Sequence, residues 1–92
     1  MNYTIDVTML SDADLVARER LALQAWIDAS ATSAAARARY RAAVQTRRDG
    51  SADHEALRAA LADERAARSI HQALSDELAR RRLSVAPALA AA

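Results

Sequence analysis

Two histidines are the residues of this chain best suited to acid–base or metal chemistry. His54 and His71 lie 17 positions apart, which is about 25 Å along a continuous helix at 1.5 Å per residue. One chain therefore cannot bring both to a single metal ion. The sequence has no cysteine, no HExxH motif and only one glycine, too few for a phosphate-binding loop. We therefore expect no metal site, no cofactor and no catalytic residues, and a protein that is not an enzyme.

His71 and Glu64 fall on the apolar face of the second helix that we expect, where a polar side chain needs a partner. His71 has two interpretations, a pH-sensitive switch or ligand and a structural histidine that bonds Ser75 one turn on. We favour the structural one. A buried, unpartnered Glu64 would have a raised pKa, and we expect it instead to reach Arg37 or Arg68.

All thirteen basic residues are arginine. Arg37 and Arg41 share a helix face, and Arg48 follows seven residues after Arg41. A basic stripe of this kind can contact phosphates, so a nucleic-acid-binding helical hairpin dimer is one hypothesis. The net charge of only +1 argues against it, because it gives no overall attraction to DNA, RNA or acidic membranes. We favour a solvated charged face.

The elements that position these side chains are long helices. Alanine occupies 26 of the 92 positions and proline one, a composition typical of helical and coiled-coil chains. The one clear break is Asp49-Gly50-Ser51, because glycine readily adopts the left-handed conformation that ends a helix. We predict helices over 11–48 and 52–83 with a turn at 49–51. The hydroxyl residues at 30–33 could mark a second break, but we favour a continuous helix.

Folding the chain about residue 50 predicts an all-α, coiled-coil-like, antiparallel two-helix hairpin over residues 11–83. Positions at alternating spacings of three and four then face one another, as a seam between two helices requires. Trp26 lies opposite Leu74 in this register, and Arg37 and Arg41 lie near Glu64. The predicted core seam comprises Ala22, Trp26, Ala29, Ala36, Tyr40, Ala43, Leu57, Ala60, Ala67, His71, Leu74 and Leu78.

Trp26 and Tyr40 are the two large aromatic residues of the helices. We interpret them as core bulk that the alanines do not supply. The alternative is that they are interface anchors, since tryptophan, tyrosine and arginine dominate binding hot spots.

Two helices cannot enclose a core, and Leu23, Ile27, Leu61 and Ile70 lie outside the predicted seam. We therefore expect a homodimer that forms a four-helix bundle, or a higher oligomer. A hairpin completed by a different protein is the alternative. These four residues, with Arg37, Arg41 and Arg48 setting orientation, form the predicted surface for a protein partner.

The expected function is a non-enzymatic interaction or assembly module: an adaptor, small inhibitor, co-chaperone or structural component. A third hypothesis, after nucleic-acid binding, is a site for small anions or nucleotides at an oligomer interface.

The two ends of the chain differ from the helices. Residues 1–10 alternate apolar and polar side chains, which predicts an extended arm or short strand, either frayed or paired with a second copy. Residues 84–92 are expected to form a flexible tail. The longest uncharged apolar run, residues 83–92, is about half the length that spans a bilayer, and no signal peptide is recognisable. We expect no membrane association and a cytoplasmic protein.

Overall fold

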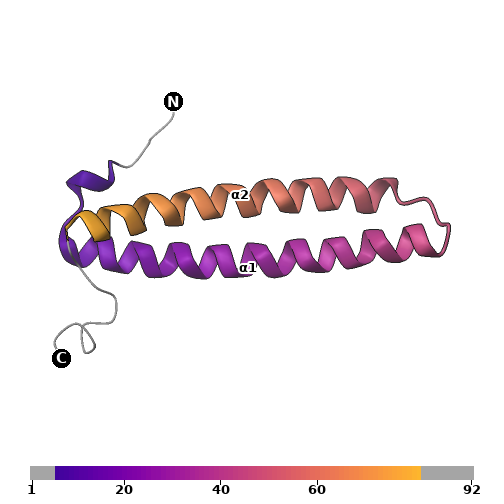
Figure 1. Cartoon of the computed structure of the whole chain (residues 1–92), viewed down its shortest axis with the longest axis horizontal. Coiled ribbons are helices and arrows are strands. Elements are labelled where there is room, and N and C mark those ends of the chain that lie inside the picture. The colour runs from indigo at the N-terminus through magenta and orange to yellow at the C-terminus, as the bar shows by residue number, and fades with distance from the viewer. Residues whose placement is uncertain (1–5, 82–92) are drawn as a thin grey trace.

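Two long antiparallel helices form the molecule. The structure is a computed structural model that describes residues 6–81. Helix α1 spans Asp12–Gln45, helix α2 spans Ser51–Arg80, and a short 3-10 helix, η1 (Val7–Met9), precedes them (Figure 1). The predicted all-α hairpin is confirmed. Its completion to a four-helix bundle by a second chain stays a prediction.

Helix α1 begins where the sequence supplies a cap. The Ser11 hydroxyl accepts a hydrogen bond from the backbone N–H of Asp14 (3.1 Å), and the carboxylates of Asp12 and Asp14 lie in the positively polarised first turn. The helix then continues without a break through residues 30–33. Thr32 there donates its hydroxyl hydrogen bond to the carbonyl of Asp28, four residues earlier, within the helical backbone. The favoured interpretation of this segment, a continuous helix, agrees with the structure.

The end of α1 differs from the prediction. The helix ends at Gln45, and the connection covers residues 46–50. The N–H of Arg48 bonds the carbonyl of Ala43 (2.9 Å) and the N–H of Arg47 bonds that of Val44 (3.2 Å), the hydrogen-bond pattern of a Schellman motif. Arg47, with φ 55°, is the left-handed residue, whereas Gly50 has φ −93°. The expectation that Gly50 supplies the left-handed conformation is therefore wrong.

Gly50 serves a different purpose, as the N-cap of α2 beside an aromatic ring. A Cβ added there would lie 3.4 Å from Cε1 of Tyr40 and 3.6 Å from Cβ of Ala43. The Asp49 carboxylate accepts hydrogen bonds from the N–H (3.0 Å) and hydroxyl (2.7 Å) of Ser51. A Cβ at residue 50 would therefore make ordinary van der Waals contact with Tyr40, and Asp49 fixes the start of α2.

These two loop positions give a paired prediction. Arg47→Gly should raise the free energy of unfolding by about 1 kcal/mol, because it removes the cost of a left-handed L-residue. Gly50→Ala should change it by no more than about 0.5 kcal/mol, because φ is allowed and the added contacts are near van der Waals distance. Urea unfolding followed by circular dichroism measures both. Destabilisation by Arg47→Gly would contradict the turn geometry.

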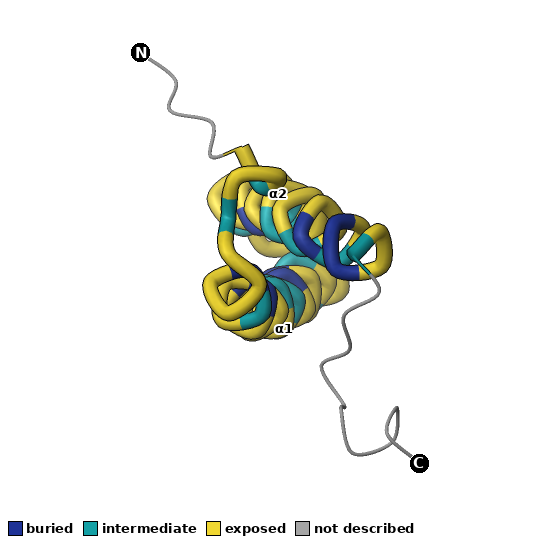
Figure 2. The backbone as a smooth tube through the Cα atoms, turned by 90° about the vertical axis from the view of Figure 1, so that its left-hand side faces the viewer, coloured by how far each residue is buried: buried dark blue, intermediate teal, exposed yellow. Residues whose placement is uncertain are grey.

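The core is a single narrow seam. Figure 2 shows the buried and half-buried positions along the sides that α1 and α2 turn toward each other. Among the twelve residues of the predicted seam, the buried ones are Ala22, Ala36, Ala43, Ala60, Leu74 and Leu78. The half-buried ones are Trp26, Ala29, Tyr40, Leu57, Ala67 and His71. The spacing of apolar residues therefore identifies the inner face of each helix.

The register across the seam differs from the reflection about residue 50. The ring of Trp26 lies 5.4 Å from the ring of His71, rather than opposite Leu74, and the ring of Tyr40 lies 5.2 Å from that of His54. The residues of α2 that meet Trp26 and Tyr40 thus come three and six residues earlier than predicted, which is about one to two helical turns. The reason is the connection, which is centred before residue 50 because α1 ends three residues early.

The N-terminal segment was expected to be extended, but η1 is helical. The Asp6 carboxylate accepts hydrogen bonds from the N–H (3.0 Å) and hydroxyl (2.6 Å) of Thr8, which caps this single turn. Val7 and Leu10, three residues apart, pack against the buried cluster that contains Leu15. Because both side chains pack on the same side of a helical turn, the segment does not adopt the alternating arrangement of a strand. Residues 1–5 of the predicted arm and the predicted tail at 84–92 lie outside the described residues.

Candidate functional site

Glu64 is the centre of a polar cluster inside the seam. Its carboxylate accepts hydrogen bonds from the hydroxyls of Ser33 (2.7 Å) and Ser30 (2.8 Å) on α1. These two bonds lower the pKa of Glu64, mainly through Ser33, and the charges of Arg37 and Arg68 act in the same direction. The expectation that Glu64 reaches Arg37 or Arg68 is therefore wrong, because its hydrogen-bond partners are the two serines and the arginines act only through their charge. The hydroxyls of α1 therefore stabilise the ionised form of the Glu64 carboxylate.

A second cluster joins Glu19 of α1 to His71 of α2. Nε2 of His71 lies 2.7 Å from Oε1 of Glu19, and the two side chains are 15% and 8% exposed. The Trp26 ring covers the imidazole on one side. Sequence reasoning paired His71 with Ser75 and missed Glu19, because the contact requires the true register. A carboxylate–imidazole pair occurs in catalytic sites, but here it joins two helices within their packed interface.

A third cluster holds η1 against the end of the hairpin. The Arg81 guanidinium donates hydrogen bonds to the carbonyls of Leu10 (2.7 Å), Val7 (3.2 Å) and Thr8 (3.2 Å), and to Glu77 (2.7 Å). Glu77 is buried, and bonds from Arg80 and then Arg81 lower its pKa from an ordinary value of 4.5 to about 2. The cluster therefore holds the backbone of residues 7–10 against the end of α2.

The ionisation of Glu77 gives a pH prediction. Because its pKa is lower in the folded state, its ion pairs contribute fully to stability above about pH 4.5 and lose that contribution as the pH falls toward 2. The difference in melting temperature between wild type and Glu77→Gln should be constant from pH 7 to 5 and shrink between pH 4.5 and 2. Thermal unfolding monitored by circular dichroism measures it. A difference that grows on acidification would contradict the assignment.

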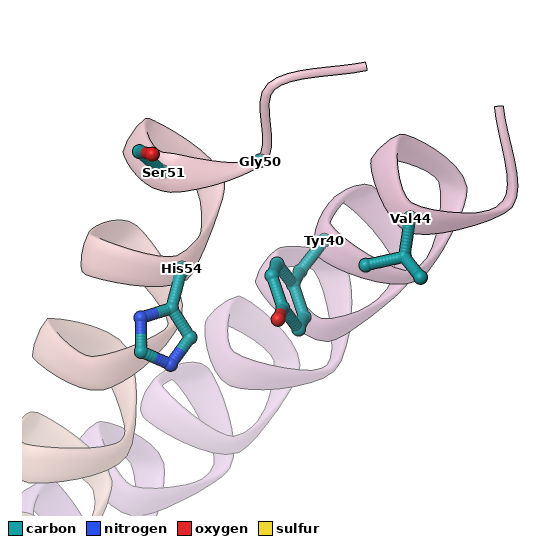
Figure 3. A pocket seen from close by; sticks show the side chains of 5 residues that line it. All are labelled: Tyr40, Val44, Gly50, Ser51 and His54. Carbon is teal, nitrogen blue, oxygen red and sulfur yellow. The ribbon is translucent and has the colours of Figure 1, made fainter. Parts of the chain in front are cut away.

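A shallow pocket of about 320 Å³ lies at the turn end of the hairpin. It is lined by Tyr40, Val44, Gly50, Ser51 and His54 (Figure 3). Tyr40 and His54 approach each other from the two helices, and the Ser51 hydroxyl donates to Asp49. The lining is mixed, because the Tyr40 ring and Val44 lie beside the polar Ser51 and the His54 imidazole. No group of three potential metal ligands occurs among residues 6–81.

The outer surface is divided into two flanks of different charge. Val44 and His54 line one pocket, and Arg37 and Arg68 both act on Glu64, so these four residues mark one side of the hairpin. By helical periodicity, this side, the basic flank, carries the arginines Arg20, Arg37, Arg41, Arg58, Arg65 and Arg68. Its apolar residues are Leu23, Ile27, Val44 and Leu61. The positions of α1 and α2 that lie on this flank hold no acidic residue.

The opposite flank is mixed in charge. It carries Asp14, Asp28 and Asp63 together with Arg18 and Arg39. Its large apolar residues are Leu21 and Ile70, set among alanines. The net charge of +1 is thus the sum of one basic flank and one flank that carries both signs of charge.

The predicted partner-binding residues are divided between these flanks. Leu23, Ile27 and Leu61 lie on the basic flank with Arg37 and Arg41. Ile70 comes nine residues after Leu61, which is about half a turn around the helix, and so belongs to the opposite flank. Arg48 lies in the connection, where its Nε donates to the Thr46 hydroxyl (2.9 Å). Tracking each residue around the helix axis would have revealed this division.

Comparisons with known proteins add no assignment. A scan against protein-family models, a search of curated proteins and a search of solved structures each returned no significant match. Neither described helix is long and apolar enough to cross a membrane.

Proposed function

We propose that this hairpin is a non-enzymatic interaction and assembly module that self-associates and presents a helical surface to a partner protein. Its role would be that of an adaptor, small inhibitor, co-chaperone or structural component. The observation that carries the proposal is the exposure of large apolar side chains on both flanks of a two-helix protein. Ile27 is 52% exposed on the basic flank, and Ile70 and Leu21 are 59% and 72% exposed on the opposite flank.

The small core supports self-association. Four of the seven buried hydrophobic residues are alanines, and Leu15 is the one large side chain that is fully buried among the described residues. A pair of helices with so little buried apolar surface gains stability when further helices cover its sides.

Charge indicates which flank faces the second copy. In a two-fold symmetric pair, the same surface meets itself. The basic flank would then set arginines against arginines. The opposite flank carries both signs, so Asp28 and Asp63 of one copy can meet Arg18 and Arg39 of the other. We therefore assign self-association to the flank that contains Leu21 and Ile70.

Light scattering coupled to size-exclusion chromatography tests this assignment. The wild type should elute at micromolar concentration as a dimer or larger oligomer. Ile70→Glu should weaken association by about tenfold or more, because it places a charge at the centre of the interface. Leu23→Glu, on the basic flank, is the matched control and should leave the oligomer unchanged. A folded, monomeric wild type would reject self-association.

Nucleic-acid binding is the second candidate, and the six arginines of the basic flank are the observation that favours it. Phosphate contacts would make affinity for DNA or RNA fall steeply between 50 and 200 mM salt. Fluorescence anisotropy with a labelled duplex and a single-stranded oligonucleotide measures this dependence. The double variant Arg41→Glu/Arg65→Glu should abolish such binding if it exists.

A further inference from the structure

The basic flank combines three features along one side of the hairpin. Leu23 and Ile27 are exposed apolar side chains on the half of α1 distant from the turn. The pocket beside Tyr40 and Val44 lies at the turn end. Five arginines lie between the two apolar residues and the pocket or border them: Arg37, Arg41, Arg58, Arg65 and Arg68.

We propose that the basic flank binds an acidic amphipathic helix of a partner protein, laid along the groove between α1 and α2. This inference rests on the proposed function and specifies its partner. Apolar side chains of the bound helix would cover Leu23 and Ile27 and enter the pocket, and its aspartates and glutamates would face the arginines.

The length of the surface defines the length of the partner. Leu23 and Val44 are 21 residues apart on α1, which is about 32 Å at 1.5 Å per residue. A helix that reaches from Leu23 to the pocket beside Val44 therefore needs about 21 residues, or three heptads. Its apolar positions would follow the coiled-coil spacing that governs the seam of the hairpin itself.

The arginines are available for such a partner. Within residues 6–81, the one salt bridge made by an arginine of this flank joins Arg58 to Glu55 at 3.8 Å, and both side chains are exposed. The Glu64 carboxylate, which feels the charges of Arg37 and Arg68, already accepts hydrogen bonds from two serines and forms no salt bridge with either arginine. Arg41 and Arg65, at the outer edges of the flank, form no salt bridge within the described residues.

Other occupants fit less well. A second copy bound by the same surface would set like charges face to face. A nucleic acid would neutralise the arginines, but its phosphates would lie against the exposed apolar side chains of Leu23 and Ile27. An acidic amphipathic helix satisfies both the charges and the apolar side chains.

Selection from a display library of 21-residue helix-forming peptides, randomised at their surface positions, tests the proposal on the full-length chain. The selected sequences should be enriched in aspartate and glutamate beside leucines at heptad spacing. Arg41→Glu/Arg65→Glu should weaken a selected peptide by about tenfold or more, because two attractions become repulsions. Ala31→Glu/Ala38→Glu, which adds two carboxylates at exposed positions of α1 outside both flanks, is the control and should change affinity less than about twofold. Circular dichroism verifies that both variants fold.

Each remaining outcome bears on the proposal. Selected peptides that are neutral or basic, or that bind the Arg41→Glu/Arg65→Glu variant unchanged, would overturn the acidic-helix inference while leaving a protein-binding function intact. An oligonucleotide that binds more tightly than any selected peptide, and is lost in that variant, would assign the flank to nucleic acid. Failure to select any helix would overturn the acidic-helix inference, whereas self-association fails only if light scattering shows a folded monomer. Loss of peptide binding in Leu23→Ser/Ile27→Ser, but not in Met9→Ser at an exposed side chain of η1, would support the apolar part of the docking surface.

Discussion

Leu15→Ala is expected to lower the free energy of unfolding by about 3 kcal/mol, within the range for a fully buried leucine. Leu15 is 0% exposed and belongs to the cluster that contains Leu74 and Leu78, with Val7 and Leu10 packed against it. The substitution leaves a cavity where η1, α1 and α2 meet. Urea unfolding followed by far-ultraviolet circular dichroism measures the loss.

Leu21→Ala is the control for this substitution. Leu21 lies six residues further along α1 and is largely exposed, so the same chemical change removes little buried surface. We expect a change of about 0.5 kcal/mol or less in the monomer, measured at a protein concentration below that at which the chain associates. Equal losses in the two variants would mean that η1 and Leu15 do not pack as the structure has them.

His71→Leu is the second large prediction, with an expected loss of about 3 kcal/mol. The reason is the carboxylate of Glu19, which is buried and has its hydrogen-bond partner in His71. Removing one member of a buried pair leaves the other desolvated without compensation. The imidazole that packs beside the Trp26 ring is also lost. Chemical denaturation at neutral pH measures the change.

A double variant separates the polar contact from packing. Glu19→Leu/His71→Leu removes both polar groups, and apolar replacement of a buried pair is often neutral or stabilising. We expect the double variant to regain most of the stability lost in His71→Leu, with a clear coupling energy in the double-mutant cycle. Additive losses would show that Glu19 and His71 do not interact.

The inner faces of the helices were predictable from sequence, because alternating three- and four-residue spacings of apolar side chains determine which side of a helix is buried. The register was not. It depends on where α1 ends, and the glycine at position 50 suggested an end that is three residues too late. A Schellman motif centred on an arginine has no strong sequence signal, since Arg47 is an unfavourable residue for a left-handed conformation.

The polar clusters were only partly predictable. Glu64 was expected on the seam, and it does lie there. Its serine partners, and the pairing of Glu19 with His71, follow only from the correct register. The asymmetry between the flanks was missed for another reason: a net charge of +1 averages over the whole surface and carries no information about position. Assigning each of Arg41, Arg65 and Ile70 an angle around its helix axis recovers the asymmetry.

The hydrogen bonds that cross the seam also bear on the uniqueness of the fold. Helices rich in alanine present nearly the same shape every seven residues, so packing by itself discriminates poorly between neighbouring alignments. Sliding α2 by one heptad would separate Ser33 from Glu64 and Glu19 from His71 together. A variant with these polar groups replaced by leucine should therefore stay folded but populate several alignments of the two helices. Its nuclear magnetic resonance spectrum should show several sets of backbone amide resonances where the wild type shows one.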